Sequence, residues 1–571
     1  METHEIYIDG QAMDLGNNFD IALLFQSFFF TDIKHIVSNR SYTVKFPPTP
    51  GNLKAVGFCA SETVSSDFPY KTHTVEYYRN GYRIIQGGLA VVLSIETDIE
   101  IAFTWGSIQN TSLLGKDKLS SLAIESMKIT SLTYVTPAQK YGLFKIDFGR
   151  GQNINYMHPS IRASYIMEKV NAKYGLGINL PNIDKYIIPL ITKESAAINR
   201  TESRRLYFVA FTTGTHIPSI QPAYGSQDNS DYFTYSGMEI TCHVGGEVTL
   251  SPNFVHYESH LNIMLNGSPI TLQGEYFNGL DPYNYRFTNV EKIIVSEGDI
   301  LSFETGMLGW LGGYQFTLEI QPEAVKPGMS FPLFENLPDM TILDFIKNIL
   351  LLEGVFMGYA NGIIIKSVDD ILANLPNAID WTDKLTNETT DFSVPPFKTF
   401  NHNELAQRNL LKWKDDDSVL GNYDGVLTVA NTTLEPEKEL FSLNFAPSDT
   451  QGGVALVPLY GADGSFKTVQ NRILFSHKYF INDDESGVFQ VYNYSLSFSG
   501  TYGIINRKYV GYQKVINKLA MIRVKCVLSD VDLVVLRSDF PVYFSQYGHS
   551  YAILRVQVKK NNECLIDLIK L

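Results

Sequence analysis

The chain has 571 residues, of which 44% are hydrophobic and 19% are charged, and its formal net charge is −14. This length exceeds what a single hydrophobic core supports, so several domains are expected. The acidic balance argues against a nucleic-acid footprint and against a basic membrane-binding patch. The four cysteines, Cys59, Cys242, Cys526 and Cys564, lie too far apart for a zinc motif or a disulfide framework.

The N-terminus, METHEIYIDG, lacks the apolar core and basic flank of a signal peptide, and no apolar run reaches the length of a membrane span. We therefore expect a chain that is made and folded in the cytoplasm, whatever its later destination. Helix-period patterns are rare, whereas turns rich in Gly, Asn and Ser are frequent. The sequence predicts a mainly β protein with a few short helices.

Residues 1–105 alternate between apolar and polar side chains and predict an N-terminal β domain. Gly81 and Gly87–Gly88 are expected in hairpin turns, with a buried strand following at Leu89–Ile95. The run LLFQSFFF at Leu23–Phe30 is unusually hydrophobic. It has two interpretations: a segment of the core, or a subunit interface.

Two later segments, Pro159–Gly175 and Pro338–Gly354, share one layout in which adding 179 to each position of the first gives the second. Each predicts a short amphipathic helix, capped at Ser160 or Asp339 and ended by its glycine in a left-handed turn. The apolar stripes are Ile166, Met167 and Val170 in the first helix, and Ile342, Phe345, Ile346 and Ile349 in the second.

An apolar, β-like run follows each glycine, at Leu176–Leu180 and at Val355–Ser367. Chance is one explanation of this shared layout, because a proline, a capping residue and a glycine are common at the ends of helices. The other is a diverged internal duplication of a barrel with one helix. On the second interpretation, residues 106–203 form the first barrel-plus-helix module and residues 323–400 form the second.

Residues 204–322, between the two helices, have a different texture, with regular and well-spaced strand signals. Seven strands in this length predict a self-contained antiparallel β-sandwich or jelly roll, inserted into the first module or linking the two. The expected strands are Leu206–Phe211, Met238–Thr241, Glu247–Ser251, His260–Leu265, Glu291–Val295, Ile300–Thr305 and Tyr314–Ile320.

This inserted region is also rich in aromatic residues. Ring faces stack on the apolar faces of sugars, so a carbohydrate-binding surface is one interpretation, and packing inside the domain or against another subunit is the other. The candidate carbohydrate or subunit contacts are Tyr232, Tyr235, Tyr283, Tyr285 and Trp310.

Residues 401–571 return to β patterns and predict a C-terminal β domain. Gly362–Lys366 precedes this domain as a strand, and Val515–Leu519 is expected to be a short helix within it. The expected C-terminal strands are Val524–Leu528, Val531–Leu536, Val542–Phe544, Tyr551–Lys559 and Cys564–Leu571.

No motif for catalysis stands out, since no Walker loop, GxSxG or GxGxxG occurs. Asp415–Asp417, followed by Asn422 and Asp424, superficially fits a calcium loop, but the spacing departs from the EF-hand pattern. We interpret it as a solvated acidic loop. We expect no enzymatic activity, no metal and no cofactor.

Three segments together resemble tail proteins from phages and prophages of Bacteroides-type bacteria. They are YIDG…ALLFQS…NRSYTVKFPPTPGN within Tyr7–Asn52, the second helix with AIDWTDKL at Ala378–Leu385, and FSQYGHSYAILRVQ…CLIDLIKL at Phe544–Leu571. The duplicated barrel-plus-helix layout is similar to the tail-hub fold of contractile-phage baseplate hubs, siphophage tail-tip hubs and type VI secretion spikes. The resemblance implies duplicated hub-type barrels, with 1–105 hub-type and 401–571 completing the hub.

The resemblance further implies a virion structural protein, a homotrimeric hub that closes the tail tube at the tail tip or baseplate. Three chains with two copies each would adapt a sixfold tube to a threefold spike. The implied partners are the tube or distal-tail protein and spike or fibre proteins. The alternative is a distal-tail or receptor-binding protein whose sandwich recognises cell-surface carbohydrate.

Overall fold

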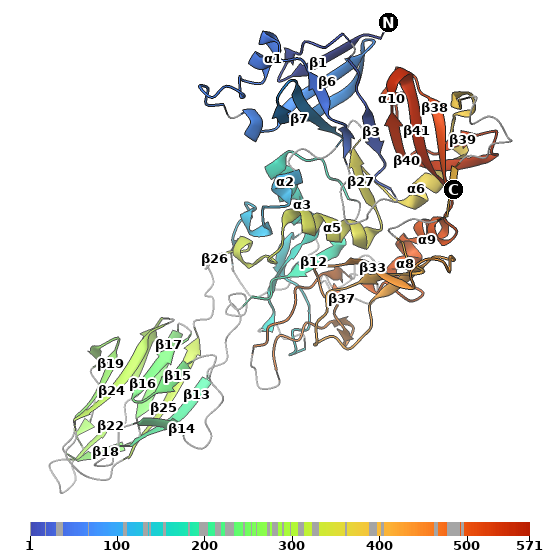
Figure 1. Cartoon of the computed structure of the whole chain (residues 1–571). Coiled ribbons are helices and arrows are strands. Elements are labelled where there is room, and N and C mark those ends of the chain that lie inside the picture. Colours follow the sequence, from blue (N-terminus) through green and yellow to red (C-terminus); the bar gives the residue numbers. More distant parts are fainter. Residues whose placement is uncertain are drawn as a thin grey trace.

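The computed structural model confirms a mainly β protein with short helices (Figure 1). Among the helices that the structure describes, none is long and apolar enough to span a membrane. The described residues are 2–571 without 18, 30–37, 67, 107–110, 129–134, 136–138, 152–155, 181–182, 193–203, 212–218, 223–232, 244–245, 253, 258–259, 271–274, 277–283, 288–290, 297, 307–312, 323–329, 360–361, 387–396, 401–404, 462–465, 477–490 and 493–495.

The N-terminal β domain, here called the N-unit, contains the first eight strands. They surround a core to which alternate residues contribute, as in β8, whose Ile99, Ile101, Phe103 and Trp105 are buried. The elements are β1 (His4–Ile8), β2 (Gln11–Ala12), β3 (Leu23–Gln26), β4 (Asn39–Ser41), β5 (Val44–Phe46), α1 (Pro50–Ala55), η1 (Phe68–Tyr70), β6 (His73–Arg79), β7 (Tyr82–Ile95) and β8 (Ile99–Trp105).

A second β unit, here called the C-unit, is built from the chain's C-terminal strands and two earlier ones. Its elements are β29 (Ile379–Asp380), β30 (Phe397–Thr399), β38 (Met521–Val527), α10 (Asp530–Val534), β39 (Val542–Phe544), β40 (His549–Val558), η10 (Lys560–Asn562) and β41 (Glu563–Lys570). The two units lie next to each other (Figure 1). They share one 14-stranded sheet whose main path is β2-β1-β6-β7-β8-β4-β3-β40-β41-β38-β30.

The two units repeat one topology. In the N-unit, β5 leads into α1, and then β6, β7 and β8 form an antiparallel meander in which β5 pairs with β8. In the C-unit, β38 leads into α10, and β39, β40 and β41 form the same meander, in which β38 pairs with β41. The chain therefore contains two copies of a strand–helix–meander unit at its two ends.

The repeat is also visible in the residues around the helices. The strand ends VKF at Val44–Phe46 and VKC at Val524–Cys526 differ by 480 in position, and so do the helix caps Thr49 and Ser529. Each cap hydroxyl accepts a hydrogen bond of 3.2 Å from the backbone N–H three residues later. Capping of this kind satisfies a donor that the first helical turn leaves free.

Two predictions in these units, one of a strand and one of a turn, were wrong. Val531–Leu536 was predicted as a strand, but α10 is a helix because Ser529 and Asp532 form a capping box, which outweighs the β preference of its valines. Gly87–Gly88 was predicted in a turn, but it lies within the continuous strand β7, next to a register shift. Gly81 does lie in the turn between β6 and β7, with φ at +78°.

The middle of the chain forms a second core around two helices. Its helical elements are α2 (Thr111–Leu114), η2 (Leu119–Ser121), α3 (Ala163–Tyr174), η4 (Ile183–Lys185), η5 (Phe334–Asn336), α5 (Ile342–Glu353), α6 (Val368–Ala373), η6 (Leu375–Asn377), η7 (Thr382–Lys384), α8 (Ile504–Lys508) and α9 (Val510–Asn517). Its strands are β9 (Met127–Lys128), β10 (Tyr141–Leu143), β11 (Pro159–Arg162), β12 (Tyr186–Pro189), β26 (Ser330–Phe331), β27 (Phe356–Tyr359), β28 (Ile363–Lys366), β31 (Arg408–Lys412), β32 (Gly425–Thr428), β33 (Glu437–Ser442), β34 (Thr450–Gln451), β35 (Val454–Ala455), β36 (Leu474–Ser476) and β37 (Val491–Tyr492).

The shared layout is confirmed at the level of the helices. Both α3 and α5 have 12 residues and end on a left-handed glycine, Gly175 or Gly354, and their apolar stripes are buried. The predicted caps were wrong. Ser160 lies in strand β11, and Thr341, rather than Asp339, caps α5.

The strands around the two helices differ. The first helix follows β11 in the sheet β10-β11-β12-β36-β37, whereas α5 is followed by the hairpin β27-β28. The predicted run at Leu176–Leu180 forms no strand. Strand pairing therefore repeats between the N-unit and the C-unit, whereas around the two helices it does not. The domain boundaries given above stay predictions.

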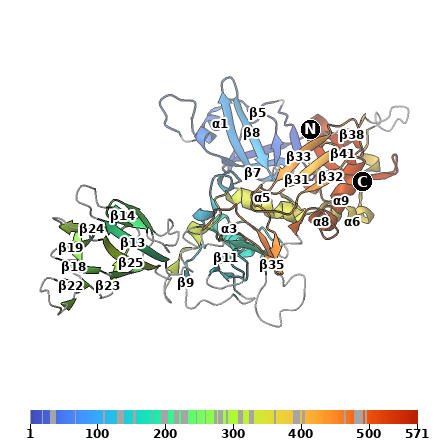
Figure 2. The same cartoon turned by 90° about the horizontal axis from the view of Figure 1, so that it is seen from below.

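The inserted region forms the predicted β-sandwich, and all seven expected strands are present. Two five-stranded antiparallel sheets have the orders β14-β13-β25-β17-β23 and β15-β16-β24-β19-β20. The sandwich stands apart from the other domains in both views (Figure 1 and Figure 2). Its strands are β13 (Arg204–Phe211), β14 (Ser219–Pro222), β15 (Phe233–Ser236), β16 (Glu239–Cys242), β17 (Gly246–Pro252), β18 (Phe254–Tyr257), β19 (His260–Leu265), β20 (Ser268–Ile270), β21 (Glu275–Tyr276), β22 (Asn284–Phe287), β23 (Glu291–Val295), β24 (Ile300–Gly306) and β25 (Gly313–Pro322).

The two helix-ending glycines make a matched pair for mutation. Alanine at Gly175, where φ is +64°, meets no atom within 4 Å and has only the left-handed backbone to oppose it, so Gly175→Ala should cost about 1 kcal/mol. Alanine at Gly354, where φ is +61°, would also place its Cβ 2.5 Å from the Lys508 carbonyl oxygen. Thermal unfolding should therefore show a larger loss for Gly354→Ala; equal losses would contradict the contact with α8.

Candidate assembly surface

The junction between the N-unit and the C-unit joins two distant parts of the chain into one sheet. Strand β3 pairs with β40 in antiparallel register, with Leu23 opposite Val558 and Gln26 opposite Arg555. Leu23 and Val558 are both fully buried in a core that draws on the two units. The run Leu23–Phe30, for which core and interface were both open, thus contributes Leu23, Leu24 and Phe29 to the core.

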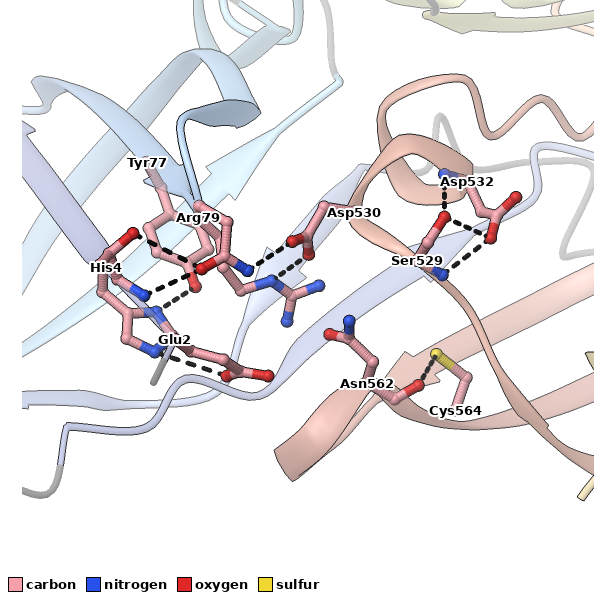
Figure 3. A network of polar contacts seen from close by, with 11 residues as sticks. Glu2, His4, Tyr77, Arg79, Ser529, Asp530, Asp532, Asn562 and Cys564 are labelled. Atoms are coloured by element: carbon pink, nitrogen blue, oxygen red, sulfur yellow. Dashed lines mark hydrogen bonds and ion pairs between the residues drawn. The ribbon is translucent and has the colours of Figure 1, made fainter.

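A buried ion pair is the second contact across this junction. Arg79, at the end of β6, points its Nε at Asp530 Oδ1 of α10 over 2.5 Å, and the two side chains are 3% and 8% exposed (Figure 3). The neighbouring Asn80 amide donates to the other Asp530 oxygen over 2.8 Å. The carboxylate of the C-unit is therefore held by two consecutive residues of the N-unit.

Two aromatic side chains of the N-unit, His4 and Tyr77, lie close to this ion pair (Figure 3). His4 Nδ1 lies 2.8 Å from the Tyr77 hydroxyl, and Tyr77 is fully buried (Figure 3). Burial lowers the pKa of His4 and raises that of Tyr77, so both groups are held in their neutral forms. The Arg79–Asp530 pair is itself buried, so the loss of one partner would leave the other charge without compensation.

A second buried cluster fixes α5 to its neighbours. Glu353, at the end of α5, accepts from Lys185 over 2.5 Å, from Lys508 of α8 over 2.8 Å, and from the Tyr186 hydroxyl. Burial alone would raise the pKa of Glu353, but the two lysines hold it below its usual value. The carboxylate thus joins three segments that lie far apart in the sequence.

The prediction of a solvated acidic loop is confirmed for Asp415 and Asp417, which are exposed, and is wrong for Asp416. Asp416 is not solvated: its carboxylate accepts from Arg472 Nη2 over 2.9 Å, and the two side chains are 6% and 0% exposed. The loop therefore anchors a buried arginine. In the parts of the chain that are described, no three His, Cys, Asp or Glu residues lie close enough together to hold a metal ion.

Of the five aromatic candidates in the sandwich, the structure describes the side chain of one. Tyr235 lies on β15 and is 42% exposed. Tyr285 belongs to β22, where it pairs with His256 of β18. Tyr232, Tyr283 and Trp310 lie outside the described residues. A carbohydrate or subunit role for these five residues stays a prediction.

No protein-family model and no curated protein matches the sequence. Among solved structures, the chain is similar to the 43 kDa tail protein of prophage MuSo2 from Shewanella oneidensis, with 8% identity and a TM-score of 0.32, over 100% of this chain and 98% of the other. Murine APRIL is similar over 21% of this chain and 99% of its own, with 12% identity and a TM-score of 0.16. At these TM-scores neither neighbour defines the fold.

Sequence reasoning missed the junction between the units. Its signal was present in VKF…T and VKC…S at a spacing of 480, but three identical or similar letters in 571 residues carry little weight before the strand pairings are known. Arg79 and Asp530 gave no signal, since they are 451 residues apart.

Removing the buried carboxylate at the junction tests its importance. Asp530→Asn leaves Arg79 charged and buried, so we expect a loss of about 3–5 kcal/mol in unfolding free energy. Ser529→Ala on the same helix is the control, and its lost cap should cost only about 1 kcal/mol. Denaturant unfolding of both variants compares them, and equal losses would show that the ion pair is unimportant.

Glu353 should also make stability depend on pH. Because its pKa is lowered in the folded chain, its contribution is present above the unfolded value of 4.5 and is lost as pH falls through the folded pKa. Glu353→Gln should lower the melting temperature at pH 7, and the difference from the parent chain should shrink below about pH 4. Glu435→Gln, at an exposed position, should match the parent chain at both pH values. A difference that does not vary with pH would contradict the pairing.

Proposed function

We propose that this protein is a structural component of a phage or prophage tail, and that it forms a hub closing the tail tube at the tail tip or baseplate. The observation that supports this most is the repeat of strand pairing between the N-unit and the C-unit, which sit in one continuous sheet. A chain with two similar units can present six of them from three copies, which suits the meeting of sixfold and threefold structures.

The sequence resemblance to tail proteins falls on these same units. Tyr7–Asn52 lies in the N-unit and Phe544–Leu571 lies in the C-unit. Since these segments supply β1, β3–β5 and β40–β41, they contain the strands through which the two units join. The residues that support the resemblance thus coincide with those that support the repeat.

The proposed role is assembly rather than catalysis. The contacts between the N-unit and the C-unit are paired strands, one buried ion pair and apolar side chains in a shared core, and these fix geometry. The sandwich, which stands away from the units, has room for a further tail component such as a spike, fibre or distal-tail protein (Figure 2). In the assembled virion, the units would then face the tube and the sandwich would face outward partners.

Mass and symmetry test the proposal. At tens of micromolar, native mass spectrometry should find particles of three times the 64.3 kDa of one chain. Class averages of these particles should show six similar densities in a ring, with three appended sandwiches. A chain that stays monomeric at this concentration, or particles without paired similar units, would contradict the hub.

A further inference from the structure

The contact inside the chain defines a geometry that each unit could repeat. Strand β3, on one side of the N-unit, extends the C-unit sheet at β40. In return, helix α10 of the C-unit packs against β7, and its Asp530 pairs with Arg79 beside the β6–β7 turn. Strand β3 of the N-unit thus packs on the C-unit, and helix α10 of the C-unit packs on the N-unit.

The C-unit has its own counterpart of β3. Strand β3 pairs with β4, placing Leu23 opposite Ser41, and β30 pairs with β38, placing Lys398 opposite Ile522. Strand β4 pairs with β8, and β38 pairs with β41. Because β8 and β41 are both the last strand of their meander, β4 aligns with β38. Strand β30 is therefore to the C-unit what β3 is to the N-unit.

The N-unit likewise has a counterpart of β40. In β40, Val558 and Val556 pair with Cys564 and Ile566, and in β7, Ile95 and Val92 pair with Ile99 and Ile101. Inside the chain, β40 receives β3 along Arg555–Val558. The equivalent stretch of β7 is Val91–Ile95.

We propose that β30 of one copy pairs with Val91–Ile95 on the outer edge of β7 in a second copy, while α1 of that second copy docks on the β39–β40 hairpin of the first. This interface deepens the proposed hub and rests on it. By equivalence with β3 and β40, Lys398 lies opposite Ile95 and Phe400 lies opposite Val92. The contact is head-to-tail, so successive copies close into a ring when the rotation allows it.

In the single chain, β6 covers part of the outer edge of β7, and η1 (Phe68–Tyr70) also contacts this strand. Strand β6 pairs with β7 only as far as His73 opposite Ala90. Beyond Ala90, no described strand pairs with β7 on the side opposite β8. Leu93, at a register shift within this stretch, is 54% exposed. The backbone groups of an unpaired strand edge can pair with another strand, which would also bury the exposed leucine.

Exposure at equivalent positions also differs in the expected way. Phe25 of β3 is half-buried and packs edge-on against Trp105 at 5.4 Å, whereas its counterpart Phe400 is 57% exposed. Phe397, the first residue of β30, is 63% exposed, and Phe400 directly follows the last residue of this strand. Phe25 is covered because the same chain provides the neighbouring unit. Phe400 is exposed because, in the proposed interface, a second copy would provide that unit.

The helices show the same contrast. Asp530, the first residue of α10, is 7% exposed because the N-unit covers it, whereas its equivalent Pro50, at the start of α1, is exposed. In Figure 1, α1 lies on the side of the N-unit away from the C-unit. Both halves of the internal contact therefore have an uncovered counterpart, one on each unit, as a head-to-tail interface requires.

Charged substitutions on the two strands test the interface. Leu93→Asp and Phe400→Asp should each convert the oligomer to monomers at tens of micromolar, because each buries a carboxylate between copies. Both side chains are exposed in the single chain, so the melting temperature of the monomer should stay unchanged. Leu420→Asp, at a residue that is 93% exposed and belongs to neither strand, is the matched control and should leave the oligomer intact.

Cross-linking gives an independent readout. In a chain with Cys59→Ser, adding both Val92→Cys and Phe400→Cys should give a disulfide-linked ladder of chains under oxidation, and a mixture of the two single variants should give dimers only. An intact oligomer with both charged variants and no cross-link would overturn this interface while the hub proposal stands. A parent chain that is monomeric throughout would overturn both.

Discussion

The edges of the shared sheet are the constraint on which the rest of this structure depends. A strand at an edge presents unpaired backbone groups, which must be covered, blunted or paired. Inside the chain, β3 covers one such edge on β40, and so strands from the two ends of the sequence become one sheet. The same arrangement leaves β30 as the last strand on the C-unit side, and beyond Ala90 no described strand pairs with the outer side of β7. The chain can therefore fold completely while some of its strand edges still lack a paired strand among the described residues.

Buried charge defines how the units meet. Hydrophobic contacts between sheets tolerate sliding, whereas Arg79 Nε and Asp530 Oδ1 meet only in one arrangement. Such a pair contributes little net stability, since desolvation offsets much of its attraction, but losing one partner is costly. Glu353 plays a similar part in the middle of the chain, where it joins α5, α8 and β12. We interpret the Arg79–Asp530 pair and the Glu353 cluster as contacts that select one packing arrangement among several that apolar side chains alone would allow.

Much of the local structure followed from residue patterns, and the failures have physical causes. The strands of the sandwich alternate cleanly, so all seven were predicted, and the left-handed glycines at 175 and 354 marked both helix ends. The valines of α10 favoured a strand until the Ser529–Asp532 box was known. The repeat itself was sought around the helices, where the periodicity is strong, whereas it lies in strand pairings that join distant segments and leave almost no trace in sequence. Long-range pairing of this kind is decided by which faces can be buried together.

The two copies have diverged where their neighbours differ. The residue that starts α10 is Asp530, whose charge is neutralised by Arg79 of the same chain, and the equivalent residue of α1 is Pro50, which has no charge to bury. A buried ion pair suits a contact that forms once, during folding, because its desolvation cost is met together with the whole core. A contact that forms between finished copies is better served by backbone pairing and exposed apolar rings, such as those of Phe397 and Phe400. The difference between Asp530 and its equivalent Pro50 thus follows from the proposed order of the contacts, in which the contact inside the chain forms before the contact between copies.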